Sequence, residues 1–76
     1  MDTIDRFEVF YIYDSAGPLW AIAAMDVDGN QIGEAEFAAK KSHATWIAQQ
    51  NRRISAPGVA IRVFTRAGAH HFDISA

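Results

Sequence analysis

Three groups of side chains could do chemistry by their type and spacing, and none of them predicts a catalytic site. Glu34 and Glu36 lie two residues apart in a predicted strand, so they share a face, as paired carboxylates would. Solvated strand carboxylates are the commoner interpretation of such a pair. His70 and His71 are neighbours in another predicted strand, so they point to opposite faces and cannot readily share a metal ion. His43 stands alone on a predicted helix.

The rest of the sequence adds no catalytic motif. It has no cysteine, which excludes a disulfide framework, a thiolate metal site and a cysteine nucleophile. Its serines lie in no nucleophile-elbow context, and its glycines are scattered through turns and form no phosphate-binding loop. We therefore expect no enzymatic activity, no metal site and no cofactor.

The composition is that of one small folded domain. Of the 76 residues, 50% are hydrophobic and 21% are charged, which favours a globule over a disordered chain. The net charge of -2 is too small for a basic nucleic-acid binder or an acidic DNA mimic. The start of the chain lacks signal-peptide features, and the longest uncharged apolar run, residues 19–25, is too short to cross a bilayer. We expect a single domain over residues 1–76, located in the cytoplasm and not in a membrane.

Hydrophobic periodicity and turn residues define the elements that must position these side chains. Aromatic and β-branched residues predict strands, and Asp28-Gly29-Asn30 is a strong hairpin signal. The predicted strands cover residues 7–13, 19–27, 31–37, 59–66 and 69–74, and the predicted helix covers residues 39–54. This β-β-β-α-β-β order predicts an α+β two-layer sandwich, in which an antiparallel sheet of four to five strands carries one helix on one face.

The predicted helix has an apolar arc centred on Ile47. At 100° per residue, five other side chains fall within about 60° of it. They are His43, Ala44, Gln50, Asn51 and Ile54. We expect this arc to pack on the sheet.

Both faces of the predicted sheet are unusually apolar. If both early hairpins have even-numbered loops, one face carries Phe7, Val9, Tyr11, Tyr13, Trp20, Ile22, Ala24, Gly33, Ala35 and Phe37. The other face then carries Glu8, Phe10, Ile12, Asp14, Leu19, Ala21, Ala23, Met25, Ile32, Glu34 and Glu36. Polarity predicts that the first face is the core and the second is open. Because one helix covers only part of a sheet, we expect an exposed apolar surface of the kind that binds a partner.

The middle of the chain resembles a small phage anti-CRISPR family. The pattern consists of the Asp28-Gly29 turn, Ile32-Gly33, Phe37 and Trp46, and the similarity covers residues 11–47. Members of that family inhibit type I CRISPR surveillance complexes by binding their backbone subunits and obstructing target DNA. The resemblance implies an antiparallel sheet with helices on one face and no catalytic activity.

The resemblance also implies contact residues. A tyrosine that ends the first long strand contributes to the family's partner contact, and Tyr13 stands at the matching position. An acidic residue in the next strand also contributes, but Ala24 stands there in this chain. The C-terminal hairpin is not matched, so the docking mode and the target need not be the same.

We interpret the chain as a non-enzymatic inhibitor that docks a sheet face on a CRISPR effector subunit. The predicted protein-binding residues are Tyr11, Tyr13 and Trp20 as aromatic anchors, with Glu34 and Glu36 meeting basic groups. Tyrosine and tryptophan suit this role because they bury a large area with few rotatable bonds.

Three alternatives remain open from the sequence. Polarity places Tyr13 and Trp20 in the core, which makes Phe10 and Met25 on the other face competing anchors. A homodimer could hide the same apolar surface. A nucleic-acid accessory module is less favoured, and it would use an aromatic residue flanked by basic ones. The candidates are Arg52, Arg53, Arg62, Arg66 and Phe64.

Overall fold

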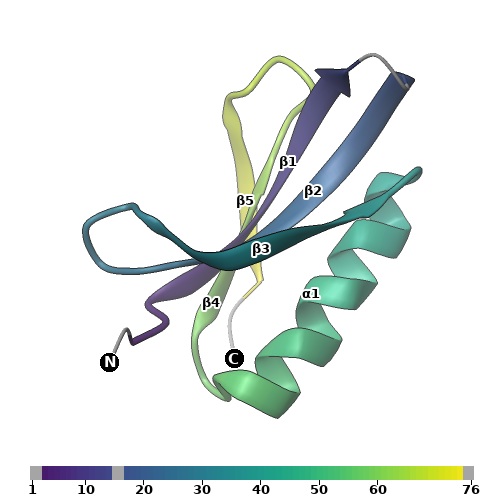
Figure 1. Cartoon of the computed structure of the whole chain (residues 1–76). Helices are drawn as coiled ribbons and strands as arrows, with labels where there is room; N and C mark the ends of the chain where they lie inside the picture. Colours follow the sequence, from purple (N-terminus) through teal and green to yellow (C-terminus); the bar gives the residue numbers. More distant parts are fainter. Residues whose placement is uncertain (1–2, 15–16, 75–76) are drawn as a thin grey trace.

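A five-stranded sheet with one helix on one of its faces makes up the computed structural model, which describes residues 3–14 and 17–74 (Figure 1). The strands are β1 (Arg6–Asp14), β2 (Gly17–Met25), β3 (Gln31–Ala38), β4 (Ala60–Phe64) and β5 (His70–Ile74), and the helix is α1 (Lys41–Ser55). The predicted α+β class and the β-β-β-α-β-β order are confirmed. No helix in the described part of the chain is long and apolar enough to span a membrane.

The sheet is mixed, which corrects the expectation of a purely antiparallel one. The strand order is β3-β2-β1-β4-β5, and β1 pairs with β4 in parallel while every other pair is antiparallel. The helix explains this difference. It carries the chain from β3 back along the sheet, so that β4 runs in the same direction as β3 and β1.

The core lies between the helix and the sheet. On the middle of β1 and β2 the predicted inner face is confirmed, since Phe7, Val9 and Ile22 are buried, but Ala21 and Ala23, expected on the open face, are buried as well. From β4, Ile61 and Val63 are fully buried beside them. The helix contributes Ala44 and Ala48, and β3 contributes Ala38.

The third strand presents the opposite faces from those predicted. The connection between β2 and β3 runs from Asp26 to Asn30, and its odd number of residues reverses which side chains of β3 share a face with those of β2. The pairing of the two strands also has a register shift between Ile22 and Ala24. Ile22 therefore pairs with Glu36, while Ala21 pairs with Phe37. Phe37, expected in the core, is 52% exposed on the open face.

The helix packs through one edge of the predicted arc around Ile47, which includes Ala44, and through the neighbouring flank that carries Ala48. Ala44 and Ala48 are completely buried, whereas Ile54 is 79% exposed. The buried side is centred about one residue, or ~100°, around the helix from Ile47, which packs only partly against the core. Alanines favour this orientation because their short side chains let the helix backbone lie close to the sheet.

The turn between β2 and β3 is fixed by Asp26 and Gly29. The Asp26 carboxylate Oδ1 accepts hydrogen bonds from the backbone N–H groups of Asp28 and Asn30, both at 2.9 Å. Gly29 adopts φ +86°, a left-handed conformation that completes the hairpin without the strain a side chain would add. The predicted Asp28-Gly29-Asn30 turn is thus present.

Candidate protein-binding site

Tyr11 and Trp20 form an aromatic pair across β1 and β2. They are register partners, and their ring centroids lie 5.3 Å apart in an edge-to-face arrangement. Trp20 packs against the edge of the core, so the pair lies on the helix side of the sheet. Both side chains are half-buried. Regular strand pairing therefore holds these two predicted anchors in one fixed geometry.

Two cations flank this aromatic pair. The Arg66 guanidinium lies 4.7 Å from the Tyr11 ring centroid, and its Nη2 donates to the Tyr11 hydroxyl at 3.0 Å. The Lys41 ammonium lies 5.2 Å from the Trp20 ring centroid. Cation–π contacts of this kind stabilise the rings and make their surroundings positive. The sequence analysis named Arg66 only as a nucleic-acid candidate and did not place either cation beside these rings, because both are distant from them in the chain.

Tyr13 follows on the same side of β1 and is largely free in solvent. Its side chain is 77% exposed, and its register partner is Pro18 near the end of the hairpin. The expectation from polarity that Tyr13 belongs to the core is wrong, because the strands extend beyond the helix that covers their middle (Figure 1). We call Tyr11, Tyr13 and Trp20 together the aromatic end.

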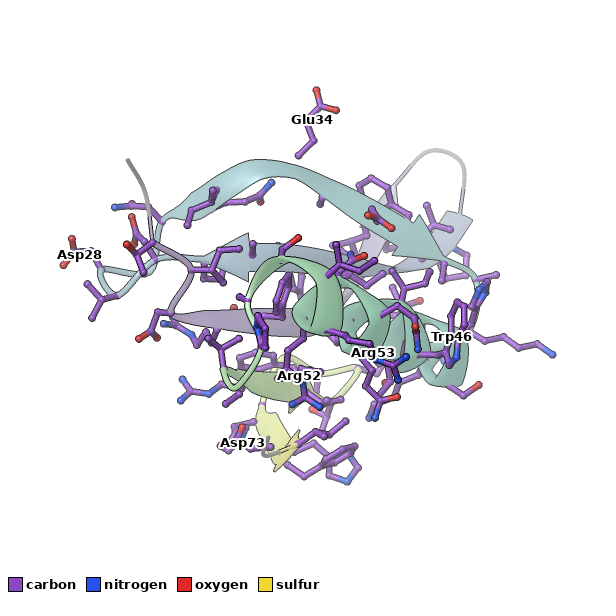
Figure 2. All side chains as sticks on the ribbon, turned by 90° about the horizontal axis from the view of Figure 1, so that it is seen from below. Asp28, Glu34, Trp46, Arg52, Arg53 and Asp73 are labelled. Carbon is purple, nitrogen blue, oxygen red and sulfur yellow. The ribbon has the colours of Figure 1, made fainter. Side chains whose placement is uncertain are left out.

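Glu34 and Glu36 do not join the aromatic end. Both line a hollow beside Asn51 of the helix, and the Asn51 amide Nδ2 donates to Glu36 Oε1 at 3.1 Å. Figure 2 shows Glu34 projecting outward from β3. The structure therefore separates the five predicted contact residues into an aromatic group and an acidic group.

The open face of the sheet has an apolar centre. Phe10, Ile12, Ala21 and Phe37 line a shallow hollow there, and no described element covers it (Figure 1). This location differs from that of Tyr13, so the competing anchor Phe10 and the aromatic end lie on opposite sides of the sheet.

Two charge pairs lie on the open face. Arg6 Nε contacts Glu8 Oε2 at 2.8 Å, and its Nη1 contacts Asp5 Oδ2 at 2.9 Å. These hydrogen bonds, that of Glu8 first, raise the pKa of the Arg6 guanidinium, which stays charged. Asp73 lies 2.8 Å from His70 Nε2 and 3.6 Å from Arg62 Nε. The face consequently combines an apolar centre with the Arg6–Glu8 and Arg62–Asp73 pairs, while Glu34, which also lines the hollow, has no ion pair among the described residues.

The basic residues do not gather around Phe64. Arg52 Nη1 donates to the backbone carbonyls of Val59 and Ile74, at 3.3 and 3.1 Å. Arg66 lies against Tyr11, while Arg62 lies beside Asp73. Of these arginines, only Arg62 shares a strand face with Phe64, two residues away on β4.

Within residues 3–14 and 17–74, no three histidine, aspartate or glutamate side chains lie close enough to hold a metal ion. His70 and His71 reach opposite sides of the sheet, as predicted: His70 contacts Asp73, and His71 contacts Lys41 of the helix.

No protein-family pattern, characterised protein or solved structure shows significant similarity to this chain.

Proposed function

We propose that this chain is a non-enzymatic inhibitor that docks its aromatic end on a partner protein. The observation that carries the proposal is Tyr13, an aromatic side chain 77% exposed beside the ordered Tyr11–Trp20 pair. Binding interfaces concentrate their affinity in tyrosine, tryptophan and arginine. Because strand pairing and the Arg66 contact already order this group, docking costs little additional side-chain entropy.

The resemblance of residues 11–47 to phage anti-CRISPR proteins leads us to propose the partner. It is a backbone subunit of a type I CRISPR surveillance complex, in the cytoplasm of a bacterial host, and docking obstructs target DNA. Tyr13 matches the contact tyrosine of that family, and its exposure leaves it accessible. Lys41 and Arg66 favour an acidic patch on the partner opposite the aromatic end. Glu34 and Glu36 remain proposed contacts for basic groups of the partner at the edge of the interface.

Inhibition of purified type I surveillance complexes tests this proposal. The measurement is binding of labelled target DNA by each complex in the presence of increasing amounts of this protein. We expect loss of DNA binding, and we expect Tyr13→Ala to weaken inhibition by ~30-fold, which corresponds to ~2 kcal/mol for a central anchor. Val27→Ala is the matched control, because Val27 is also 77% exposed but lies in the turn at the other end of β2.

Two results would contradict the proposal. Unchanged DNA binding with every complex tested would refute the assigned partner. If Tyr13→Ala unfolds the domain, as circular dichroism would detect, the side chain has a structural role and the interface assignment is wrong.

A homodimer is the second candidate, and it is favoured by the open face. A two-fold interface brings the same patch of each copy together, so unpaired charges there would repel or stay unsatisfied. Here Arg6 is paired with Glu8, and Arg62 lies beside Asp73, around an apolar centre. Light scattering at several concentrations should then give twice the monomer mass, and Phe37→Glu should restore the monomer. A monomeric mass at every concentration excludes this candidate.

A further inference from the structure

A groove runs between the helix and β5, separate from the open face. The helix packs on β1, β2, β3 and β4, while β5 extends past it. The resulting groove has a volume of about 650 Å³ and a mostly apolar lining. Its two large apolar side chains, Trp46 and Phe72, are 55% and 41% exposed. Figure 2 shows Trp46 on the helix in front of the sheet. The groove thus offers apolar contact area that the described chain leaves in water.

One wall of this groove is an edge strand. Because β5 is the last strand of the sheet, the outer backbone groups of its described residues have no neighbouring strand. Its pairing with β4 is regular from Phe72 to Ile74, after a register shift near His70. An unpaired edge of this kind is a template for another extended segment.

The opposite edge, β3, is protected against such pairing. Gly33 lies beside a register shift with φ +71°, and the Gln31 side-chain Nε2 donates to the Gly33 carbonyl at 3.0 Å. Glu34 adds a charge on the same edge. Shifts, side-chain capping and charges are the devices that keep edge strands from pairing. β5 has a register shift only near His70, so its segment Phe72–Ile74 is the regular edge that can accept a short strand.

The groove is locally positive although the chain carries a net charge of -2. Its lining includes Lys41 and His71 and no acidic residue. The Lys41 ammonium lies 3.0 Å from His71 Nδ1, and because an ammonium only donates, the ring presents a lone pair to it. Lys41 also lies 5.8 Å from the Phe72 ring centroid. Beyond the far end of the groove, Arg52 binds the Ile74 carbonyl at 3.1 Å. Cations therefore lie near both ends of this wall.

We propose that this groove binds an extended peptide segment of another protein, which adds a strand to β5. Alternate side chains of such a strand point to the same face, ~6.6 Å apart, so one apolar side chain lies between Trp46 and Phe72. Acidic side chains two positions away on that face then approach Lys41 at one end and Arg52 at the other. Backbone hydrogen bonds to β5 supply the affinity, and the apolar and acidic side chains supply the specificity. This site shares Lys41 with the aromatic end but otherwise uses different residues, and it does not depend on the proposed inhibitor function.

Titration of the intact, isotope-labelled protein with defined peptides, followed by NMR, tests the proposal. The probe is the capped peptide Thr-Glu-Thr-Phe-Thr-Glu-Thr, in which the phenylalanine and both glutamates share one face of a strand. We expect saturable amide shifts in β5 and in the first half of α1, with a dissociation constant near ~1 mM or tighter. The counterpart with lysine in place of glutamate should bind at least threefold more weakly. A counterpart N-methylated on the pairing edge should not bind, because it lacks the donors that a strand needs.

Substitutions in the groove separate the contributions of its charge and of its apolar side chains to peptide binding. Lys41→Glu should reverse the preference between the glutamate and lysine peptides, while Lys40→Glu, a neighbouring exposed lysine outside the groove lining, should change it little. Phe72→Thr should weaken binding about tenfold, and Trp46→Gln gives the same test should the first variant unfold. Tyr13→Ala should leave peptide binding unchanged, which distinguishes this site from the aromatic end.

The proposal is overturned by no saturable shifts at ~5 mM peptide, by shifts confined to the open face, or by equal binding of the N-methylated peptide. Equal affinity for the glutamate and lysine peptides also overturns it, because the assignment of an acidic partner rests on Lys41.

Discussion

The orientation of the helix can be tested by one pair of substitutions, Ala48→Leu and Ile54→Ala. Hydrophobicity alone predicts that Ile54 matters and that a larger residue at position 48 is harmless. The structure predicts the reverse, because Ala48 is completely buried against the sheet and Ile54 is 79% exposed.

The expected magnitudes follow from burial. Leucine at position 48 adds three carbon atoms where no space is open, and such overpacking typically costs ~1–3 kcal/mol. Ile54 keeps only about a fifth of its surface from water, which is worth ~0.5 kcal/mol of the ~2–3 kcal/mol for full burial. The better helix propensity of alanine offsets a few tenths of a kcal/mol of that loss. Ile54→Ala should therefore be nearly neutral.

Thermal and urea unfolding followed by circular dichroism measure both effects. A domain of this size has a free energy of unfolding of ~4–11 kcal/mol, so both variants should remain folded. Each kcal/mol lowers Tm by ~4–8 °C, which makes the Ala48→Leu effect measurable and the Ile54→Ala effect small. A loss above ~1.5 kcal/mol for Ile54→Ala together with a neutral Ala48→Leu would show that the helix packs through the arc around Ile47.

Three further substitutions test other contacts. Gly29→Val should destabilise the domain by ~1–3 kcal/mol in urea unfolding, because a β-branched residue must adopt φ +86°, whereas Gly29→Asn should cost less. Arg52→Ala should cost ~1–2 kcal/mol, because it leaves the Val59 and Ile74 carbonyls without their shared donor; Arg53→Ala, at an exposed position on the same helix, should cost under ~0.5 kcal/mol. Tyr13→Ala should lower the free energy of unfolding by no more than ~1 kcal/mol, since three quarters of the side chain is already in solvent, and a larger loss would contradict its placement.

The sequence predicted the elements and the inner face of the first two strands, because alternation and turn residues are local signals. It misassigned β3, and the reason is the length of one loop. A hairpin connection with an odd number of residues reverses which side chains share a face, and the register shift near Ile22 is not visible in the residue types. Phe37 therefore lies on the open face, and Ala38 takes its place in the core.

The parallel pairing of β1 with β4 was not predictable from local patterns either. It depends on the path of the helix across the sheet, which periodicity does not determine. The orientation of the helix was predicted incorrectly for a related reason: Ile47 and Ile54 are the most apolar residues, but the close approach of two layers selects the small ones, Ala44 and Ala48.

The candidate site was predicted in part. Aromatic residues at alternate positions of paired strands indicated Tyr11, Tyr13 and Trp20 as one group, and the structure brings Tyr11 and Trp20 into contact. Arg66 could not be found in this way, because 55 residues separate it from Tyr11. The groove beside β5 was missed for the same reason, since it forms only when Lys41 and Phe72 meet across the helix and the edge strand.

The position of β1 in the middle of the sheet affects the order of assembly during synthesis. Among the described strands β1 leaves the ribosome before the others, and β2 can pair with it at once as a local hairpin. Its other edge stays open until β4 has emerged, almost 50 residues later in the chain. A nascent chain therefore exposes Phe7 and Val9 beside an unpaired edge until β4 is made, which is the interval in which a chaperone has most to protect.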